Sequence, residues 1–149
     1  NGVGSITAFY TVLAEGDDQQ DPVADAARSF LDGHVVLTRQ LAESGHYPAI
    51  DIEQSISRVM TAVTTPLQQA SARRLKSLWS RYQRSRELIT IGAYAAGSDE
   101  QTDLAIRLMP EIERFLCQDI GDRCDLTDSN AALERLLGSD APATDRVVR

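Results

Sequence analysis

The sequence predicts an α/β region followed by an all-helical region. Three observations support this fold class: a continuous apolar run of strand length near the start, a strand–helix–strand succession over residues 4–37, and apolar residues at helical spacing beyond residue 65. We expect the α/β region to span residues 1–65, the helical region 66–138 and a polar tail 139–149. The length of 149 residues suits one ordinary domain or two small ones.

The first part of the α/β region predicts a strand, a helix and a second strand. Residues 4–13 (GSITAFYTVL) are apolar, β-branched and aromatic almost throughout, which is typical of a strand buried on both faces of a parallel sheet. A helix is expected to start at Pro22 with Asp21 as its N-cap. Residues 34–37 (HVVL) then form a second short strand. This succession is typical of an α/β unit.

The second part of the α/β region is less regular. Residues 38–44 predict a short helix that Gly45 stops. Pro48 disfavours helix in the residue before it, and residues 55–60 are expected to form a helical turn. The Thr64-Thr65-Pro66 sequence marks the boundary with the helical region.

Four helices are expected in the helical region. They span residues 67–91, 99–109, 110–117 and 131–137. Pro110 is expected to open the third helix, since proline is favoured at the first helical position. Asp128 or Ser129 is expected to cap the fourth.

Composition excludes several classes of protein. The chain is 42% hydrophobic, too apolar for a disordered tail, and it has neither a membrane-length apolar run nor a secretory signal. The net charge of −7 argues against nucleic-acid binding.

Cys117 and Cys124 are expected to be two free thiols, because their spacing does not fit a zinc site. Because the first residue is Asn and a strand-like run follows at once, we expect the chain to be part of a longer protein.

Two charged segments leave alternatives open. Glu15, Asp17, Asp18 and Asp21 form an acidic loop, interpreted as a solvated turn, an interaction loop for a basic partner or, third, a metal site without the regularity of a calcium loop. Residues 73–86 carry six basic side chains and no acidic one, which indicates a solvated helix face, a docking face for an acidic partner or, third, a nucleic-acid contact, which the acidic remainder of the chain disfavours.

Motifs for self-contained catalysis are absent. The sequence has no GxxxxGK[ST] phosphate-binding loop, no GxGxxG and no nucleophile elbow. The segment alone is therefore not expected to be a complete enzyme.

The sequence nevertheless closely resembles the rotary ATPase family, and in particular the export ATPases of flagella and type III secretion systems, which are relatives of the ATP synthase catalytic subunit. Five stretches carry the resemblance: GSITAFYTVL (4–13), LDGHVVLTRQLAESGHYPAID (31–51), SISRVM (55–60), RYQRSRELITIGAYAAGSD (81–99) and RFLCQDI (114–120). The resemblance implies the C-terminal part of a RecA-like P-loop ATPase core, with a parallel sheet, followed by a helical C-terminal domain. The family's phosphate-binding loop, water-activating carboxylate and magnesium-holding strand would all lie upstream.

The resemblance also implies roles for particular residues. Arg58 aligns with the arginine finger that reaches the γ-phosphate held by a neighbouring subunit, and Tyr47 matches the aromatic residue that stacks on adenine. Asp17, Asp18 and Asp21 match a loop that grips the central stalk. No metal ligand is expected in this chain. Where the family places further adenine-pocket aromatics, this sequence has other residue types: Ile120, Arg123 and Leu126.

The function implied is ATP hydrolysis, with Mg²⁺, that energises flagellar or type III protein export. The intact protein would be a cytoplasmic homohexamer, peripheral to the inner membrane, with a coiled-coil stalk protein and export chaperone–substrate complexes as partners and no nucleic acid. Three alternatives remain: an oligomerisation and partner-docking module, an RNA-translocating terminator-like hexamer, and a non-catalytic ring subunit.

Overall fold

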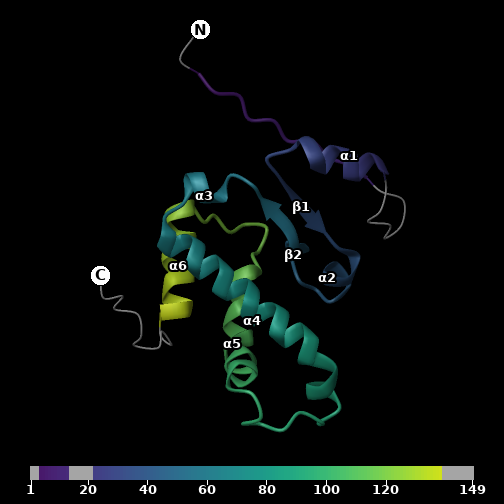
Figure 1. Cartoon of the computed structure of the whole chain (residues 1–149), viewed down its shortest axis with the longest axis vertical. Coiled ribbons are helices and arrows are strands. Elements are labelled where there is room, and N and C mark those ends of the chain that lie inside the picture. Colours follow the sequence, from purple (N-terminus) through teal and green to yellow (C-terminus); the bar gives the residue numbers. More distant parts are fainter. Residues whose placement is uncertain (1–3, 14–21, 139–149) are drawn as a thin grey trace.

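The computed structural model describes residues 4–13 and 22–138, which form a small sheet with short helices beside a bundle of longer helices (Figure 1). The elements in chain order are α1 (Pro22–Phe30), β1 (Gly33–Leu37), α2 (Arg39–Glu43), β2 (Ile50–Ser57), α3 (Met60–Val63), α4 (Pro66–Thr90), α5 (Glu100–Leu116) and α6 (Leu126–Gly138). The helices expected to start at Pro22 and to span 38–44 and 67–91 are confirmed, as is the strand at 34–37.

The sheet consists of β1 and β2, paired antiparallel. Gly33 lies opposite Ser57 and Leu37 opposite Ile50, with an irregularity between His34 and Val36. At that irregularity the Ser55 hydroxyl accepts a hydrogen bond from the Val36 N–H at 3.0 Å. The described residues contain no parallel pair, so the parallel sheet expected from the sequence is not shown.

Residues 4–13 belong to no helix or strand, contrary to the strand expected there. Their large side chains are exposed: Ile6 is 98%, Phe9 95% and Leu13 91% accessible. A strand of this apolar character needs a neighbouring strand on each side and cover on both faces. The described residues supply neither, because β1 and β2 pair only with each other.

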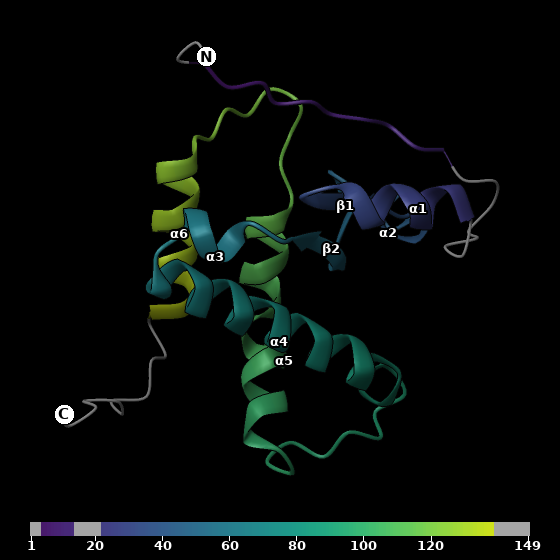
Figure 2. The same cartoon turned by 45° about the horizontal axis from the view of Figure 1, so that its top comes forward.

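The described hydrophobic core lies almost wholly in the helical bundle, where α4 packs against α5 and α6 (Figure 2). The buried core residues are Leu75, Leu78, Trp79, Ala105, Leu108, Met109, Ile112, Leu136 and Leu137. In α5 the buried residues recur every three or four positions, which makes one apolar stripe along the helix. The bundle therefore has its own core, built from amphipathic helices.

Local sequence explains where α4 begins. Thr65 and Gln68 form a capping box, in which each side chain accepts a hydrogen bond from the other residue's backbone N–H, and Pro66 follows at the first helical position. These contacts satisfy donors that a helix N-terminus otherwise leaves unpaired.

Three sequence predictions about helices and turns are wrong. Pro110 lies inside α5 and does not separate two helices, because buried Leu108, Met109 and Ile112 hold both halves against the bundle. The residue that caps α6 is Asp125, whose carboxylate accepts the Asp128 N–H at 2.8 Å. The helical turn expected over residues 55–60 is absent, since β2 runs to Ser57 and α3 starts only at Met60.

The sheet region is tied to α4 by a hydrogen bond and by an aromatic contact. The Lys76 ammonium of α4 donates to the Ser55 carbonyl of β2 at 2.9 Å. The His46 ring meets the Trp79 ring edge-on, with centroids 5.8 Å apart. The His46 contact holds the loop before β2, which carries Tyr47, against the bundle.

Candidate functional site

Tyr47 lies in the loop between α2 and β2, with 56% of its surface exposed. Its backbone carbonyl accepts a hydrogen bond from the Gln118 N–H at 2.8 Å, just beyond the end of α5. The neighbouring His46 places Nδ1 3.4 Å from the Cys117 Sγ. The backbone around Tyr47 is therefore held against the end of α5, while its ring stays accessible for stacking.

Arg58 directly follows β2 and is exposed. Its guanidinium donates from Nη2 to the Arg28 carbonyl at 3.0 Å and from Nη1 to the Ser29 carbonyl at 3.2 Å, both in the last turn of α1. Its backbone N–H donates to the Asp32 carbonyl at 2.8 Å. The last carbonyls of a helix lack partners within the helix and carry partial negative charge, so a guanidinium is a favourable partner there.

Tyr47 lies three residues before the start of β2, and Arg58 directly follows its end. The two ends of β2, Ile50 and Ser57, pair with Leu37 and Gly33, the two ends of the five-residue strand β1, so at about 3.4 Å per residue they lie about 14 Å apart. The structure therefore does not bring these two residues into one pocket.

The third group of expected site residues, Asp17, Asp18 and Asp21, lies outside the described residues. The described part of the chain resumes at Pro22, the first residue of α1. The Arg58 guanidinium contacts the last turn of α1, at the opposite end of this helix from Pro22.

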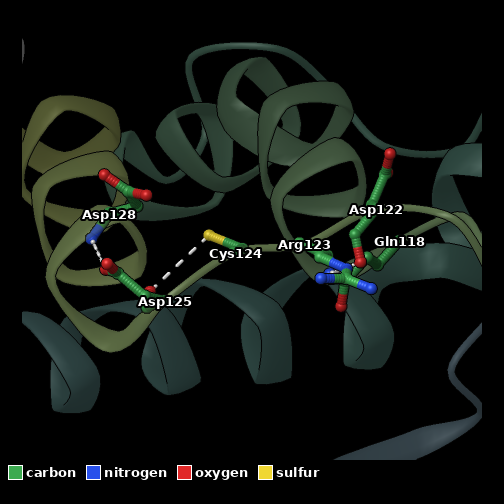
Figure 3. A pocket seen from close by; sticks show the side chains of 6 residues that line it. All are labelled: Gln118, Asp122, Arg123, Cys124, Asp125 and Asp128. Atoms are coloured by element: carbon green, nitrogen blue, oxygen red, sulfur yellow. Dashed lines mark hydrogen bonds between the residues drawn. The ribbon is translucent and has the colours of Figure 1, made fainter.

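The segment between α5 and α6 surrounds an open hollow (Figure 3). Its lining residues are Gln118, Asp122, Arg123, Cys124, Asp125 and Asp128. The lining carries three carboxylates and one guanidinium, so its net charge is negative, which disfavours binding of a phosphate group. Ile120 and Leu126 are largely exposed, so neither covers an adenine next to Tyr47 in the described structure.

The basic segment 73–86 makes internal contacts that sequence patterning did not reveal. Arg81 pairs with Asp99 at 3.1 Å, and Arg74 donates to the Leu137 carbonyl at 3.3 Å. Together with the Lys76 contact to β2, these bonds tie α4 to its neighbours. Neighbouring elements far apart in sequence supply the partners, so spacing alone could not have identified them.

Asp99 organises the turn before α5. Its carboxylate accepts hydrogen bonds from the Thr102 hydroxyl and the Gln101 N–H and faces Arg81. The Thr102 hydrogen bond, followed by the Gln101 bond and the Arg81 charge, lowers the pKa of Asp99 from its usual 3.8. Asp103 supports the same turn by accepting hydrogen bonds from the Tyr94 hydroxyl and the Gly97 N–H, each at 2.8 Å.

Metal-ligating residues do not cluster in residues 4–13 and 22–138, where no three His, Cys, Asp or Glu side chains could hold one ion. Both cysteines are exposed free thiols, as the sequence predicts. Within the same described ranges, every helix is too short or too polar to cross a membrane.

Comparison with known proteins places this geometry in a family. The model of the ATP synthase alpha/beta family nucleotide-binding domain matches residues 1–57, and the model of the type III secretion EscN ATPase C-terminal domain matches residues 64–135. A flagellum-specific ATP synthase of Pseudomonas aeruginosa is 62% identical over 136 residues, which cover 91% of this chain and 30% of that protein. The chain belongs to the flagellum-specific and type III secretion ATPase family.

Solved structures agree with this membership. The chain is similar to the assembled ATPase EscN of the enteropathogenic Escherichia coli type III secretion system, with a TM-score of 0.86 and 44% identity over 89% of this chain and 32% of that one. It is also similar to EscN in complex with its central stalk EscO, with a TM-score of 0.73 and 41% identity over 77% of this chain and 28% of that one. The chain thus spans about 30% of the length of the export ATPases it matches.

Proposed function

We propose that this chain is the C-terminal part of an ATP-hydrolysing export ATPase and that Arg58 is its arginine finger. Arg58 would reach the γ-phosphate of ATP bound by the neighbouring subunit of a homohexamer. The observation that carries the proposal is an exposed guanidinium directly after the end of β2, at the opposite end of this strand from the loop that carries Tyr47. The flagellar system is favoured over the virulence-type one because the flagellar relative is 62% identical and EscN 44%.

The chemistry suits a guanidinium. Negative charge spreads over the phosphoryl oxygens as the phosphoryl group is transferred, and Arg58 offers a permanent positive charge with forked donors. A finger supplied by a neighbouring subunit is worth about 10³ to 10⁵ in kcat. Mg²⁺ bound with ATP would neutralise phosphate charge, and the described residues form no ligand cluster for it.

Tyr47 would stack on the adenine of the ATP bound by its own subunit. The accessible ring and the backbone bond from Gln118 support this role, because stacking needs an exposed aromatic face on a fixed backbone. Exposed Ile120 and Leu126, which stand where the family has further aromatics, imply loose selectivity for the base.

The proposal includes the division of the chain into domains. Residues 1–65 would complete a RecA-like core whose parallel sheet covers the exposed apolar residues 4–13, residues 66–138 would be the helical C-terminal domain, and 139–149 a tail. The two family matches end and begin at residues 57 and 64, which supports a boundary near residue 65.

The partners follow from the family. Asp17, Asp18 and Asp21, together with the turn at 97–103, would face a coiled-coil central stalk protein, and the relative EscN in complex with its stalk EscO supports this assignment. The hexamer would act in the cytoplasm, peripheral to the inner membrane, on export chaperone–substrate complexes.

The test compares ATP hydrolysis by the full-length protein with that of its Arg58→Ala variant. We expect kcat to fall by about 10³-fold or more, with nucleotide affinity and hexamer formation unchanged. Nucleotide binding by fluorescence titration and ring size by sedimentation are the accompanying measurements. Unchanged kcat would contradict the finger role and favour a docking module or a non-catalytic subunit.

A further inference from the structure

Arg58 makes three hydrogen bonds to the last turn of α1 and to the connection that joins α1 to β1. Its guanidinium is bound by the Arg28 and Ser29 carbonyls, and its backbone N–H by the Asp32 carbonyl. Directly after Asp32, Gly33 pairs with Ser57, the residue before Arg58. We call this segment, residues 28–33, the Arg58 cradle.

Gly33 determines how closely the cradle approaches β2. A Cβ atom at this position would lie 2.5 Å from the Ile56 carbonyl oxygen and 3.2 Å from the Ser57 Cα. Both are backbone atoms, so they cannot move away as a flexible side chain would. In the described residues, positive φ angles occur at Gly45, Gly92 and Gly97 and not at Gly33, so the need for glycine here is one of space.

We infer that Gly33 is a positioning residue for the proposed arginine finger. Without a side chain at this position, β1 lies directly against the end of β2, and the last carbonyls of α1 then meet the guanidinium of Arg58. Two of the five N–H donors of the guanidinium are engaged by the cradle in the described structure, which leaves donors on the same rigid fork for phosphate oxygens. This inference rests on the proposed function of Arg58 and goes beyond it.

Fixing the guanidinium before the reaction matters for rate. A long arginine side chain has many rotamers, and ordering it during each turnover costs conformational entropy. A displacement of about 1 Å at a catalytic group can lower the rate by about 10²-fold. A shift of the Gly33–Ser57 pair is therefore expected to lower kcat and to leave binding of ATP, which depends on other residues, unchanged.

The experiment uses the full-length ATPase with Gly33→Ala, Arg58→Ala and the double variant, and measures kcat, nucleotide Kd and hexamer formation. We expect Gly33→Ala to lower kcat by about 10- to 100-fold with Kd and hexamers unchanged. In the Arg58→Ala background the same substitution is expected to have no further effect, because the two residues act as one unit. Gly138→Ala is the matched control, since a Cβ atom there meets nothing within 4 Å.

A second variant guards against a failure of Gly33→Ala to assemble. Insertion of one glycine between Leu31 and Asp32 lengthens the turn and separates the α1 carbonyls from Arg58 without adding an atom between β1 and β2. We expect it to lower kcat in the same way.

Several results would overturn the inference. These are wild-type kcat in both cradle variants, a Gly33→Ala effect that multiplies that of Arg58→Ala, a rise in kcat, or loss of hexamers in both variants, which would mean a general structural role. If Arg58→Ala itself leaves kcat unchanged, the proposed function fails. If only the cradle variants leave it unchanged, the positioning role alone fails.

Discussion

The sheet region (residues 22–58) and the helical bundle (residues 66–138) differ in how much of their apolar side-chain surface they bury. The bundle buries nine core residues from α4, α5 and α6, whereas the sheet region buries only Ala24. Phe30, Val35 and Leu37 of the sheet region are each at least 67% exposed. Stability in the described structure therefore resides in the bundle, while Tyr47 and Arg58 lie on the region whose apolar surface still needs cover.

This difference separates two kinds of residue experimentally. Substitutions in the bundle are expected to change the free energy of unfolding, whereas those at the ends of β2 change chemistry or nucleotide affinity. Trp79, the single tryptophan, lies in the bundle core with 6% of its surface exposed and reports unfolding of the bundle.

The largest effect on stability is expected for Ile112→Ala. Ile112 is fully buried, so the substitution removes apolar contacts and leaves a cavity, at a cost of about 2 to 5 kcal/mol. Urea unfolding followed by Trp79 fluorescence measures it. Ile120→Ala is the matched control, because Ile120 is fully exposed and its truncation should change little. Equal effects of the two substitutions would mean that α5 is not the centre of the core.

A smaller effect, on affinity rather than stability, is expected for Tyr47→Ala. Loss of base stacking costs about 1 to 3 kcal/mol, which corresponds to about 5- to 150-fold weaker ATP binding. Tyr47→Phe keeps the aromatic face and should bind nearly as well as the wild type. Titration of the full-length protein with a fluorescent ATP analogue measures both. Wild-type affinity of the alanine variant would remove Tyr47 from the nucleotide site.

The smallest effect is expected for Asp99→Asn at the turn before α5. The pKa of Asp99 is lowered in the folded chain, so its stabilising contribution is present above pH 3.8 and is lost as pH falls from there through the folded-state pKa. The variant should therefore lose less stability than the wild type between neutral pH and pH 3. Urea midpoints across this range test it, with exposed Asp119→Asn as the control. Parallel pH profiles of wild type and Asp99→Asn would contradict the role.

The fold could be predicted where local signals decide it. The Thr65-Pro66 start of α4 and the Gly45 end of the 38–44 helix follow from capping and helix-breaking residues alone. The prediction that Pro110 opens a new helix is wrong because tertiary packing of α5 overrides the helix-breaking tendency of proline. The strand expected over residues 4–13 is not formed in the described structure, because strand formation depends on partners that a local sequence cannot supply.

The candidate site was predictable in residue identity but not in geometry. Arg58 and Tyr47 were found through resemblance to a family, since an arginine after a strand and a tyrosine before a proline carry no distinctive spacing. The carbonyls of Arg28 and Ser29 that hold Arg58 lie 30 and 29 positions away in sequence. Any residue type can supply a backbone carbonyl, so these acceptors cannot be recognised from the sequence. Gly33, which allows β1 to approach Ser57 closely, looks in the sequence like an ordinary glycine at the end of a helix.

The most direct test of the central claim mixes two inactive forms of the full-length ATPase. One carries Arg58→Ala, and the other has an intact Arg58 but a disabled upstream phosphate-binding loop. If Arg58 acts across the subunit interface, mixed hexamers contain sites that combine an intact loop with an intact Arg58, and ATP hydrolysis returns in proportion to those sites. If hydrolysis stays absent although mixed hexamers form, Arg58 does not act on the neighbouring subunit's ATP.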